Sequence, residues 1–190
     1  MDTKKLDTKR QRLNTIIHIA HRLFEESGYE NVGIREICQS AGLSPTQLYR
    51  LGVTKQDLLA EVILRVNQQQ IVKIKAFSAR GFKSAQAYIE TYLLNLYEAD
   101  IAIKGIRAEG AAFGWKWSGK YEELIIAQVF QLIKPIADAL EHDRYDEVQA
   151  RCYAIWSLYY LGYRHAVIHN GNAKACLDAI KPSLALCLKR

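Results

Sequence analysis

Length, composition and charge describe a globular chain with a basic balance. The chain has 190 residues, of which 49% are hydrophobic and 24% charged, with a net charge of +6 and a sequence pI near 9.1. These values allow one or two small domains with a substantial core and exclude a disordered chain. The charged first ten residues are untypical of a signal peptide, and no uncharged apolar run is long enough to span a bilayer. The positive charge favours an anionic partner without identifying it.

The first predicted element is a helix over residues 9–27. Its apolar residues recur at helical spacing, and Thr8-x-x-Gln11 has the pattern of an N-terminal cap. Basic residues cluster before this helix and in its first turn, and we expect them to lie in a solvated, frayed terminus; the alternative is that they add phosphate or minor-groove contacts.

Residues 33–55, GIREICQSAGLSPTQLYRLGVTK, predict two short helices separated by a tight turn. The first spans 34–39 with Gly33 at its N-cap, and Gly42 breaks it because glycine adopts a positive φ without steric cost. The second begins after Ser44, which forms a capping box with Gln47, while Pro45 suits the first helical position.

The second short helix is polar on its outer side. Leu48 and Leu51 face inward. The side chains that remain on the outer face are those of Thr46, Gln47, Tyr49 and Arg50. Hydroxyl, amide and guanidinium groups suit base edges and phosphates, so the segment is typical of a helix-turn-helix that reads DNA. Lys55, in the first turn of the next helix, gains nothing from the helix dipole and favours an external anion.

Residues 8–59 resemble the DNA-binding domain of the TetR/AcrR family of bacterial regulators. The resemblance rests on the order and spacing of Ile17-x-x-Ala20-x-x-Leu23-Phe24, Gly28-Tyr29, Ile34-Arg35-Glu36-Ile37, Ala41-Gly42-Leu43-Ser44, Leu48-Tyr49 and Lys55-x-x-Leu58-Leu59. It implies an all-α dimer with a three-helix helix-turn-helix domain at 1–58 and a helical effector-binding and dimerisation domain at 59–190. By position, it implies that the DNA-binding residues are Arg35, Ser44, Pro45, Thr46, Gln47, Tyr49, Arg50 and Lys55.

Two positions depart from the family pattern. The family usually has Thr or Ser, with a hydroxyl that often touches a phosphate, where this chain has Gly33. It usually has an aromatic residue, commonly Phe, where this chain has Gly52. We expect the missing ring to remove packing beneath the second short helix and Gly52 to loosen the end of that helix.

The remaining chain predicts helices throughout. Their expected spans are 55 into the seventies, 84–99, 101–112, 121–142, 145–169 and 173–188. The polar run 67–70 predicts an exposed stretch, Ala79-Arg80-Gly81 a break, and the Gly/Trp-rich residues 114–119 a connector. Pro135 and Pro182 fall inside helical patterns, where each removes a backbone donor and predicts a kink or a split.

Aromatic residues concentrate in the second half of the chain. Core packing explains most of them, but buried tyrosine hydroxyls need partners, and a cavity with a few polar groups is where ligands bind. The resemblance implies a pocket here for a small, often apolar or aromatic effector. The candidate ligand-binding residues are Tyr88, Tyr92, Asn95, Arg107, Glu109, Phe113, Trp117, Phe130, Trp156 and Tyr159.

The resemblance also implies that the last two helices pair with those of a second copy as a four-helix bundle. The candidate interface residues are Trp156, Tyr160, Tyr163, Val167, Leu177, Ile180, Leu184 and Leu188. Two-fold symmetry then predicts a palindromic operator with half-sites about one helical turn apart, or a multiple of it.

Catalytic and metal-binding patterns are absent from the sequence. His165 and His169 have a real ligand spacing on a helix, but no acidic or thiol ligand stands beside them. The four cysteines show no CxxC spacing and are typical of reduced thiols in a cytoplasmic protein. We predict no cofactor and no catalytic residue.

Three functional hypotheses follow. The leading one is a cytoplasmic transcriptional repressor that binds double-stranded operator DNA as a homodimer and is released by a small-molecule effector, with no membrane partner. The alternative is a DNA-binding protein without small-molecule input, regulated by a protein partner or acting in chromosome organisation. A helical enzyme would need a convergent acid–base set, which the sequence does not show.

Overall fold

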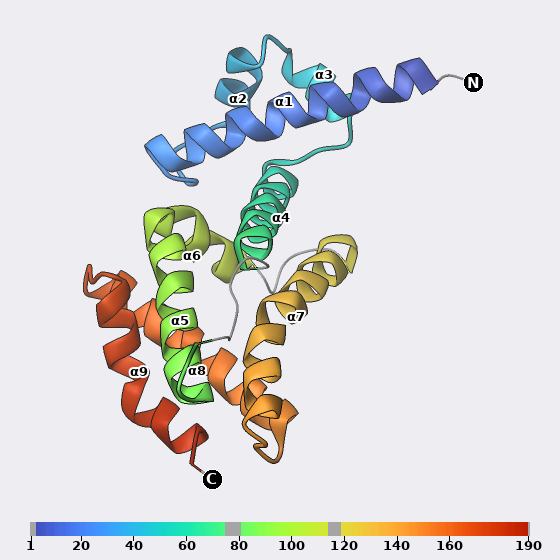
Figure 1. The fold of residues 1–190 in the computed structure, drawn as a ribbon. Helices are drawn as coiled ribbons and strands as arrows, with labels where there is room; N and C mark the ends of the chain where they lie inside the picture. Colours follow the sequence, from blue (N-terminus) through green and yellow to red (C-terminus); the bar gives the residue numbers. More distant parts are fainter. Residues whose placement is uncertain (1–2, 75–80, 114–118, 190) are drawn as a thin grey trace. The chain divides into compact units, whose positions relative to one another are not determined.

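The computed structural model describes residues 3–74, 81–113 and 119–189, with 3–8, 112–113 and 120 described by their backbone alone. Within these ranges all regular secondary structure is helical, so the predicted all-α fold is confirmed (Figure 1). The helices are α1 (Thr3–Ser27), α2 (Ile34–Ser40), α3 (Pro45–Arg50), α4 (Lys55–Ile74), α5 (Ala85–Ala102), α6 (Lys104–Phe113), α7 (Gly119–His142), α8 (Val148–Ile168) and α9 (Ala173–Cys187). None of the described helices is long and apolar enough to cross a membrane.

Several helix ends differ from the predicted ones. The first helix begins at Thr3, so Thr8 lies inside it rather than at its cap, because residues 3–8 contain no Gly or Pro to stop it. The eighth begins at Val148, three residues later than predicted. Arg144 and Glu147 adopt positive φ values of 59° and 48°, which a right-handed helix cannot include.

The two internal prolines do not divide their helices. Pro135 lies within α7 and Pro182 within α9, and each helix continues on both sides of its proline. A helix break was predicted at Ala79-Arg80-Gly81. Gly81 adopts a φ of +102°, and Ala79 and Arg80 lie outside the described residues. Residues 114–118 of the predicted connector also lie outside them, and Gly119 begins α7.

The first compact unit contains the described residues up to Val66 together with 105–123. In this unit α1 packs on α2, and α2 on α3. Its core includes the buried side chains of Ile16, Ile17, Ala20, Phe24, Tyr29, Ile37, Leu48, Leu58 and Leu59. The ring of Phe24 meets that of Tyr29 edge-on, with centroids 5.2 Å apart. From the later segment, Ile106 is buried and the Tyr121 hydroxyl donates to Glu61.

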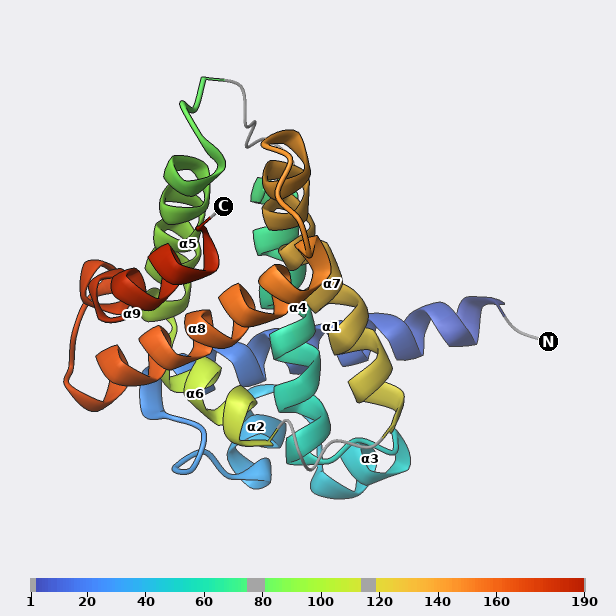
Figure 2. The ribbon, with the colours of Figure 1, turned by 90° about the horizontal axis from the view of Figure 1, so that it is seen from below.

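The second unit contains α4 from Asn67 on, α5, α7 from Leu124 on, α8 and α9. Helix α9 packs along both α8 and α5 (Figure 2). Gly162 permits the close approach of α8 and α9, because a Cβ atom at this position would lie 2.5 Å from the carbonyl oxygen of Cys176. The core of the unit includes Tyr92, Leu93, Tyr97, Ile136, Leu140, Ile155, Tyr159, Ile180 and Leu184.

A buried carboxylate ties three helices of the second unit together. Asp100 on α5 is only 4% exposed; its Oδ1 accepts a hydrogen bond from Gln70 Nε2 on α4 (2.7 Å), and its Oδ2 accepts one from the Tyr159 hydroxyl on α8 (2.5 Å). The expectation that the run 67–70 is exposed is therefore wrong for Gln70, and also for Asn67, which is buried. The partner of Gln70 lies 30 residues away, beyond the reach of a local polar pattern.

Candidate nucleic-acid interface

Helix α3 begins with the predicted capping box. The Ser44 hydroxyl accepts a hydrogen bond from the Gln47 backbone N–H (3.3 Å), and Gln47 Oε1 accepts one from the Ser44 N–H (2.8 Å). Pro45 occupies the first helical position, where its missing N–H costs nothing. These local bonds stabilise a helix of only six residues, which would otherwise be too short to hold its shape.

Glycines shape both sides of α2 and α3. Gly42 adopts a φ of +65° in the turn between them, as predicted. Gly33 is the N-cap of α2, with extended backbone and no side chain to cap the helix. Gly52 follows α3 with a φ of +72°, and its N–H donates to the Tyr49 carbonyl. An aromatic side chain at position 52 would be strained in this backbone, so the departure from the family pattern has a conformational reason here.

Most of the predicted DNA-binding side chains lie on the surface. Those that are exposed are Arg35, Ser44, Thr46, Gln47, Tyr49 and Arg50, while Pro45 is half-buried. Tyr49 is 64% exposed, which is unusual for a large aromatic side chain without a partner. Because Ser44 and Gln47 bond to each other, Thr46, Tyr49 and Arg50 are the side chains of α3 with polar groups outside the cap.

Lys55 is half-buried at the start of α4. Its Nζ lies 4.1 Å from the centroid of the Tyr29 ring, a cation–π distance. A second capping box begins this helix: the Thr54 hydroxyl accepts from the Asp57 N–H (3.1 Å), and the Asp57 carboxylate accepts from the Thr54 N–H (2.8 Å). The lysine is thus held in place by an aromatic face.

Two candidate ligand-binding residues belong to the first unit instead. Arg107 and Glu109 lie on the part of α6 that packs with that unit, and both are half-buried. Burial raises the pKa of Glu109, the negative charge of Glu30 raises it further, and Lys55 lowers it. Glu109 therefore lies in the electrostatic surroundings of Lys55.

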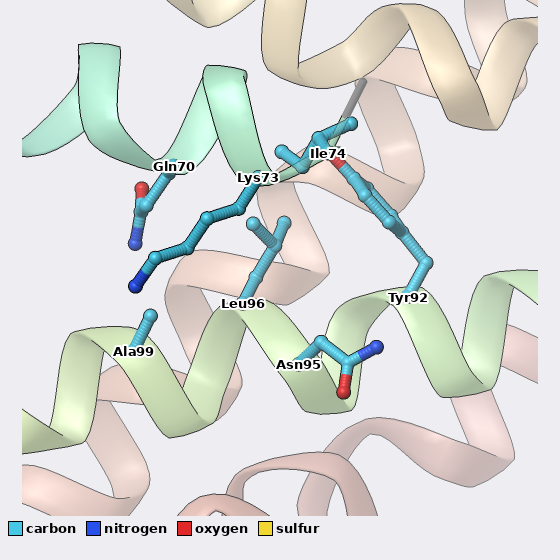
Figure 3. A pocket seen from close by; sticks show the side chains of 7 residues that line it. All are labelled: Gln70, Lys73, Ile74, Tyr92, Asn95, Leu96 and Ala99. Atoms are coloured by element: carbon cyan, nitrogen blue, oxygen red, sulfur yellow. The ribbon is translucent and has the colours of Figure 1, made fainter. Parts of the chain in front are cut away.

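The second unit contains a cavity of about 190 Å³ between α4 and α5. Its lining consists of Gln70, Lys73, Ile74, Tyr92, Asn95, Leu96 and Ala99 (Figure 3). Tyr92 and Asn95 were among the predicted ligand-binding residues. The other five lining residues were not predicted, because the prediction started from aromatic residues. The i, i+3, i+4 spacing of Gln70, Lys73 and Ile74 places them on one helix face and could have indicated them.

Of the remaining ligand candidates, those whose side chains the structure describes do not line the cavity. Tyr88 stacks on Tyr92 with centroids 5.9 Å apart, and Trp156 stacks on Tyr159 at 5.0 Å. The Tyr159 hydroxyl donates to Asp100, which in turn accepts from Gln70 in the cavity wall. Phe130 is 53% exposed on α7. Trp117 and the side chain of Phe113 lie outside the described residues.

Most of the candidate dimer-interface residues face the interior of their own chain. Those that are buried are Tyr163, Leu177, Ile180, Leu184 and Leu188, while Trp156 and Val167 are half-buried and Tyr160 is 44% exposed. The exposed large apolar side chains of α8 and α9 are Tyr153, Tyr160, Leu161, Ile168 and Leu186, of which only Tyr160 is a candidate.

The histidine pair lies on the surface of α8 and just after it. The ring centroids of His165 and His169 are 4.6 Å apart, and both residues are exposed. Among the described residues, no group of three or more His, Cys, Asp and Glu side chains is arranged to hold a metal ion.

Comparison with known proteins places the helix-turn-helix in a family. Residues 16–62 match the model of "Bacterial regulatory proteins, tetR family". The "HTH-type transcriptional regulator UidR" of Escherichia coli is 25% identical over 75 residues, 40% of this chain and 38% of that protein. The helix-turn-helix segment of this chain, residues 16–62, is of the tetR family. The match to the curated relative spans less than half of either protein.

Solved structures share the fold over nearly the whole chain. A TetR/AcrR regulator from Thermobifida fusca superposes with a TM-score of 0.67 at 16% identity, covering 95% of this chain and 100% of that one. GusR from Salmonella enterica covers both chains fully, with a TM-score of 0.65 and 16% identity. FadR from Bacillus subtilis, solved in complex with stearoyl-CoA, has a TM-score of 0.65 at 16% identity and covers 92% of this chain and 97% of that one.

The tetR-family match includes every candidate DNA-binding residue of this chain, from Arg35 to Lys55. It ends at residue 62, four residues before the boundary of the first unit inside α4. The family assignment thus rests on the unit that carries α3, and the low-identity structural likeness extends the fold to the second unit.

Proposed function

We propose that this chain is a ligand-responsive transcriptional repressor that binds a palindromic operator as a homodimer in the bacterial cytoplasm. The observation that carries the proposal is the capped helix α3, which presents Thr46, Tyr49 and Arg50 to solvent within a tetR-family helix-turn-helix. A short, rigid helix with an exposed polar face is suited to the major groove.

The polar groups of the helix-turn-helix divide into two roles. Ser44 and Gln47 hold each other in the capping box, so they support the helix before they contact DNA. Thr46 and Arg50 are then the groups proposed to contact base edges. Tyr49 and Lys55 are proposed to hold phosphates, the lysine steadied by the Tyr29 ring.

A second copy of the chain is proposed to cover exposed apolar side chains of α8 and α9. These include Tyr160 and Leu161 on α8 and Leu186 on α9, each more than 40% exposed. Apolar surface of this kind favours association, and a two-fold dimer presents two α3 helices to two half-sites.

Sedimentation velocity of a matched pair of variants tests the dimer. Leu161 is 56% exposed on α8 and Phe130 is 53% exposed on α7. We expect Leu161→Glu to shift the chain to monomer and Phe130→Glu to leave the dimer intact. The same dissociation in both variants, or in neither, contradicts the α8 and α9 interface.

The ligand response is proposed from the cavity in the second unit and from the similar FadR structure, whose ligand is stearoyl-CoA. A ligand that favours a conformation unable to bind DNA lowers operator affinity, and linkage requires that operator DNA lower ligand affinity by the same factor. A ligand that binds without any effect on operator affinity would favour the alternative, a DNA-binding protein without small-molecule input.

Selection from randomised duplex DNA tests the central claim. We expect a palindromic sequence with half-sites about one helical turn apart, or a multiple of it. Arg50→Ala should weaken binding to that sequence roughly tenfold or more, whereas Arg22→Ala, which removes the same charge from the surface of α1, should not. Enrichment of no sequence, or equal losses in both variants, contradicts specific readout by α3.

A further inference from the structure

We infer that the cavity between α4 and α5 binds a small carboxylate with a compact apolar body, an inference that rests on the proposed ligand response and specifies the class of its ligand. Two facing helix stripes form the cavity, Gln70, Lys73 and Ile74 on α4 and Tyr92, Asn95, Leu96 and Ala99 on α5 (Figure 3). All seven residues belong to the second unit.

The size of the cavity limits the ligand. Its volume of about 190 Å³ lies below the roughly 300–1,000 Å³ that is typical of sites for drug-sized ligands. The side chains of Ile74, Leu96 and Ala99 and the ring of Tyr92 provide apolar walls. A short acyl chain or a single ring fits these walls better than an extended polar molecule.

The charge of the residues that line the cavity favours a ligand with an anionic group. Lys73 is the only charged residue among the seven, and no acidic residue lines the cavity. Within the part of the chain that the structure describes, the Lys73 ammonium makes no hydrogen bond and no ion pair. Figure 3 shows this group at the end of the cavity near Gln70 and Ala99, while the Asn95 amide lies toward Tyr92. A carboxylate at the Lys73 end would gain a charge-assisted hydrogen bond.

The nearest acid does not cancel this preference. Asp100 lies behind Gln70, and its two oxygens accept hydrogen bonds from Gln70 and Tyr159. Because the residue is almost fully buried, it presents no carboxylate to the cavity. The two hydrogen bonds link the Gln70 side chain through Asp100 to Tyr159 on α8, and Lys73 beside it is exposed.

Two matched pairs of probes test the inference. Phenylacetate and phenylacetamide, and hexanoate and hexanamide, are titrated into the full-length protein and followed by ligand-observed NMR and calorimetry. We expect each acid to bind about tenfold more tightly than its amide, because only the acid forms the charge-assisted bond.

Three variants locate the site. Lys73→Met keeps the stem and removes the charge, so it should reduce each acid to the affinity of its amide. Lys83→Met, which removes an equal charge from an exposed residue outside the cavity, should change nothing. Ala99→Leu fills the end of the cavity near the ammonium and should weaken all four compounds. Acids and amides of equal affinity, acids insensitive to Lys73→Met, or acids that do not bind at millimolar concentration each overturn the inference.

An operator-release measurement separates this inference from the proposed function. Lys73-dependent binding of the acids with unchanged operator affinity upholds the carboxylate site and contradicts the ligand response. Release of operator DNA by the amides as readily as by the acids upholds the ligand response and overturns the carboxylate preference.

Discussion

Gly162 on α8 lies directly against the hydroxyl of Tyr97 on α5, which leaves no room for a Cβ atom. The same hydroxyl donates to the Tyr159 carbonyl (2.9 Å), and the rings of Tyr97 and Tyr159 stack with centroids 4.5 Å apart. The glycine therefore determines how closely α5, α8 and α9 approach one another.

We predict that Gly162→Ala destabilises the protein by about 1–3 kcal/mol, because the methyl group displaces the Tyr97 hydroxyl and the Cys176 carbonyl. Urea unfolding measures the change in the free energy of unfolding. Gly105→Ala is the control: this glycine also lies in a helix, but nothing approaches its added Cβ within 4 Å. Equal destabilisation by both substitutions would contradict the packing argument.

A comparison of Ser44→Ala with Thr46→Ala should distinguish stabilisation of helix α3 from direct contact with DNA. Removing the Ser44 hydroxyl abolishes half of the capping box and should cost about 1 kcal/mol of stability. Thr46 is exposed in the same helix turn, and no cap bond depends on it. Thr46→Ala should therefore weaken operator binding at unchanged stability, which thermal unfolding and DNA titration on both variants can establish.

Gly33→Ser should strengthen both the N-terminus of α2 and DNA binding. The backbone at Gly33 is extended (φ −91°, ψ 151°), and an added Cβ meets nothing within 4 Å. A serine cap should add a few tenths of a kcal/mol relative to glycine, and its hydroxyl can donate to a phosphate. Gly33→Ala, which lacks the hydroxyl, is expected to improve neither property; a gain with alanine would point to backbone entropy instead.

Gly52→Ala should destabilise α3, whereas Gly52→Asn should be tolerated better. The φ of +72° costs an alanine about 1 kcal/mol or more, and Asn visits this region more readily than other non-glycine residues. Denaturation midpoints of the two variants test the order. Alanine and asparagine with the same midpoint would show that the left-handed conformation is not maintained.

Two buried thiols should make stability fall at alkaline pH. Burial raises the pKa of Cys152 and of Cys176 to about 11, from an ordinary value of 9.0. The folded state therefore retains these protons after the unfolded chain has lost them, so their contribution is complete below pH 9 and is lost as the pH rises towards 11. Urea midpoints between pH 8 and 10.5 should fall less steeply in the Cys152→Ala, Cys176→Ala double variant; equal slopes would contradict the assignment.

The amino-acid sequence by itself determined the elements whose interactions are local. Two examples are the capping box of Ser44 and Gln47 and the turn at Gly42. Each involves residues within a few positions of one another, so the spacing of residue types in the sequence predicts its geometry. The family likeness of the helix-turn-helix rests on the same short-range pattern.

Only the tertiary structure decided which faces of the later helices are buried and where the cavity lies. Helix α8 has apolar residues on most sides, so periodicity could not show that Tyr163 faces inward while Leu161 faces outward. The close packing of α5 and α9 against Gly162 places this side of α8 in the interior. Likewise, Gln70 is buried because Asp100 and Tyr159, distant in sequence, satisfy a polar group that a local pattern assigns to the surface.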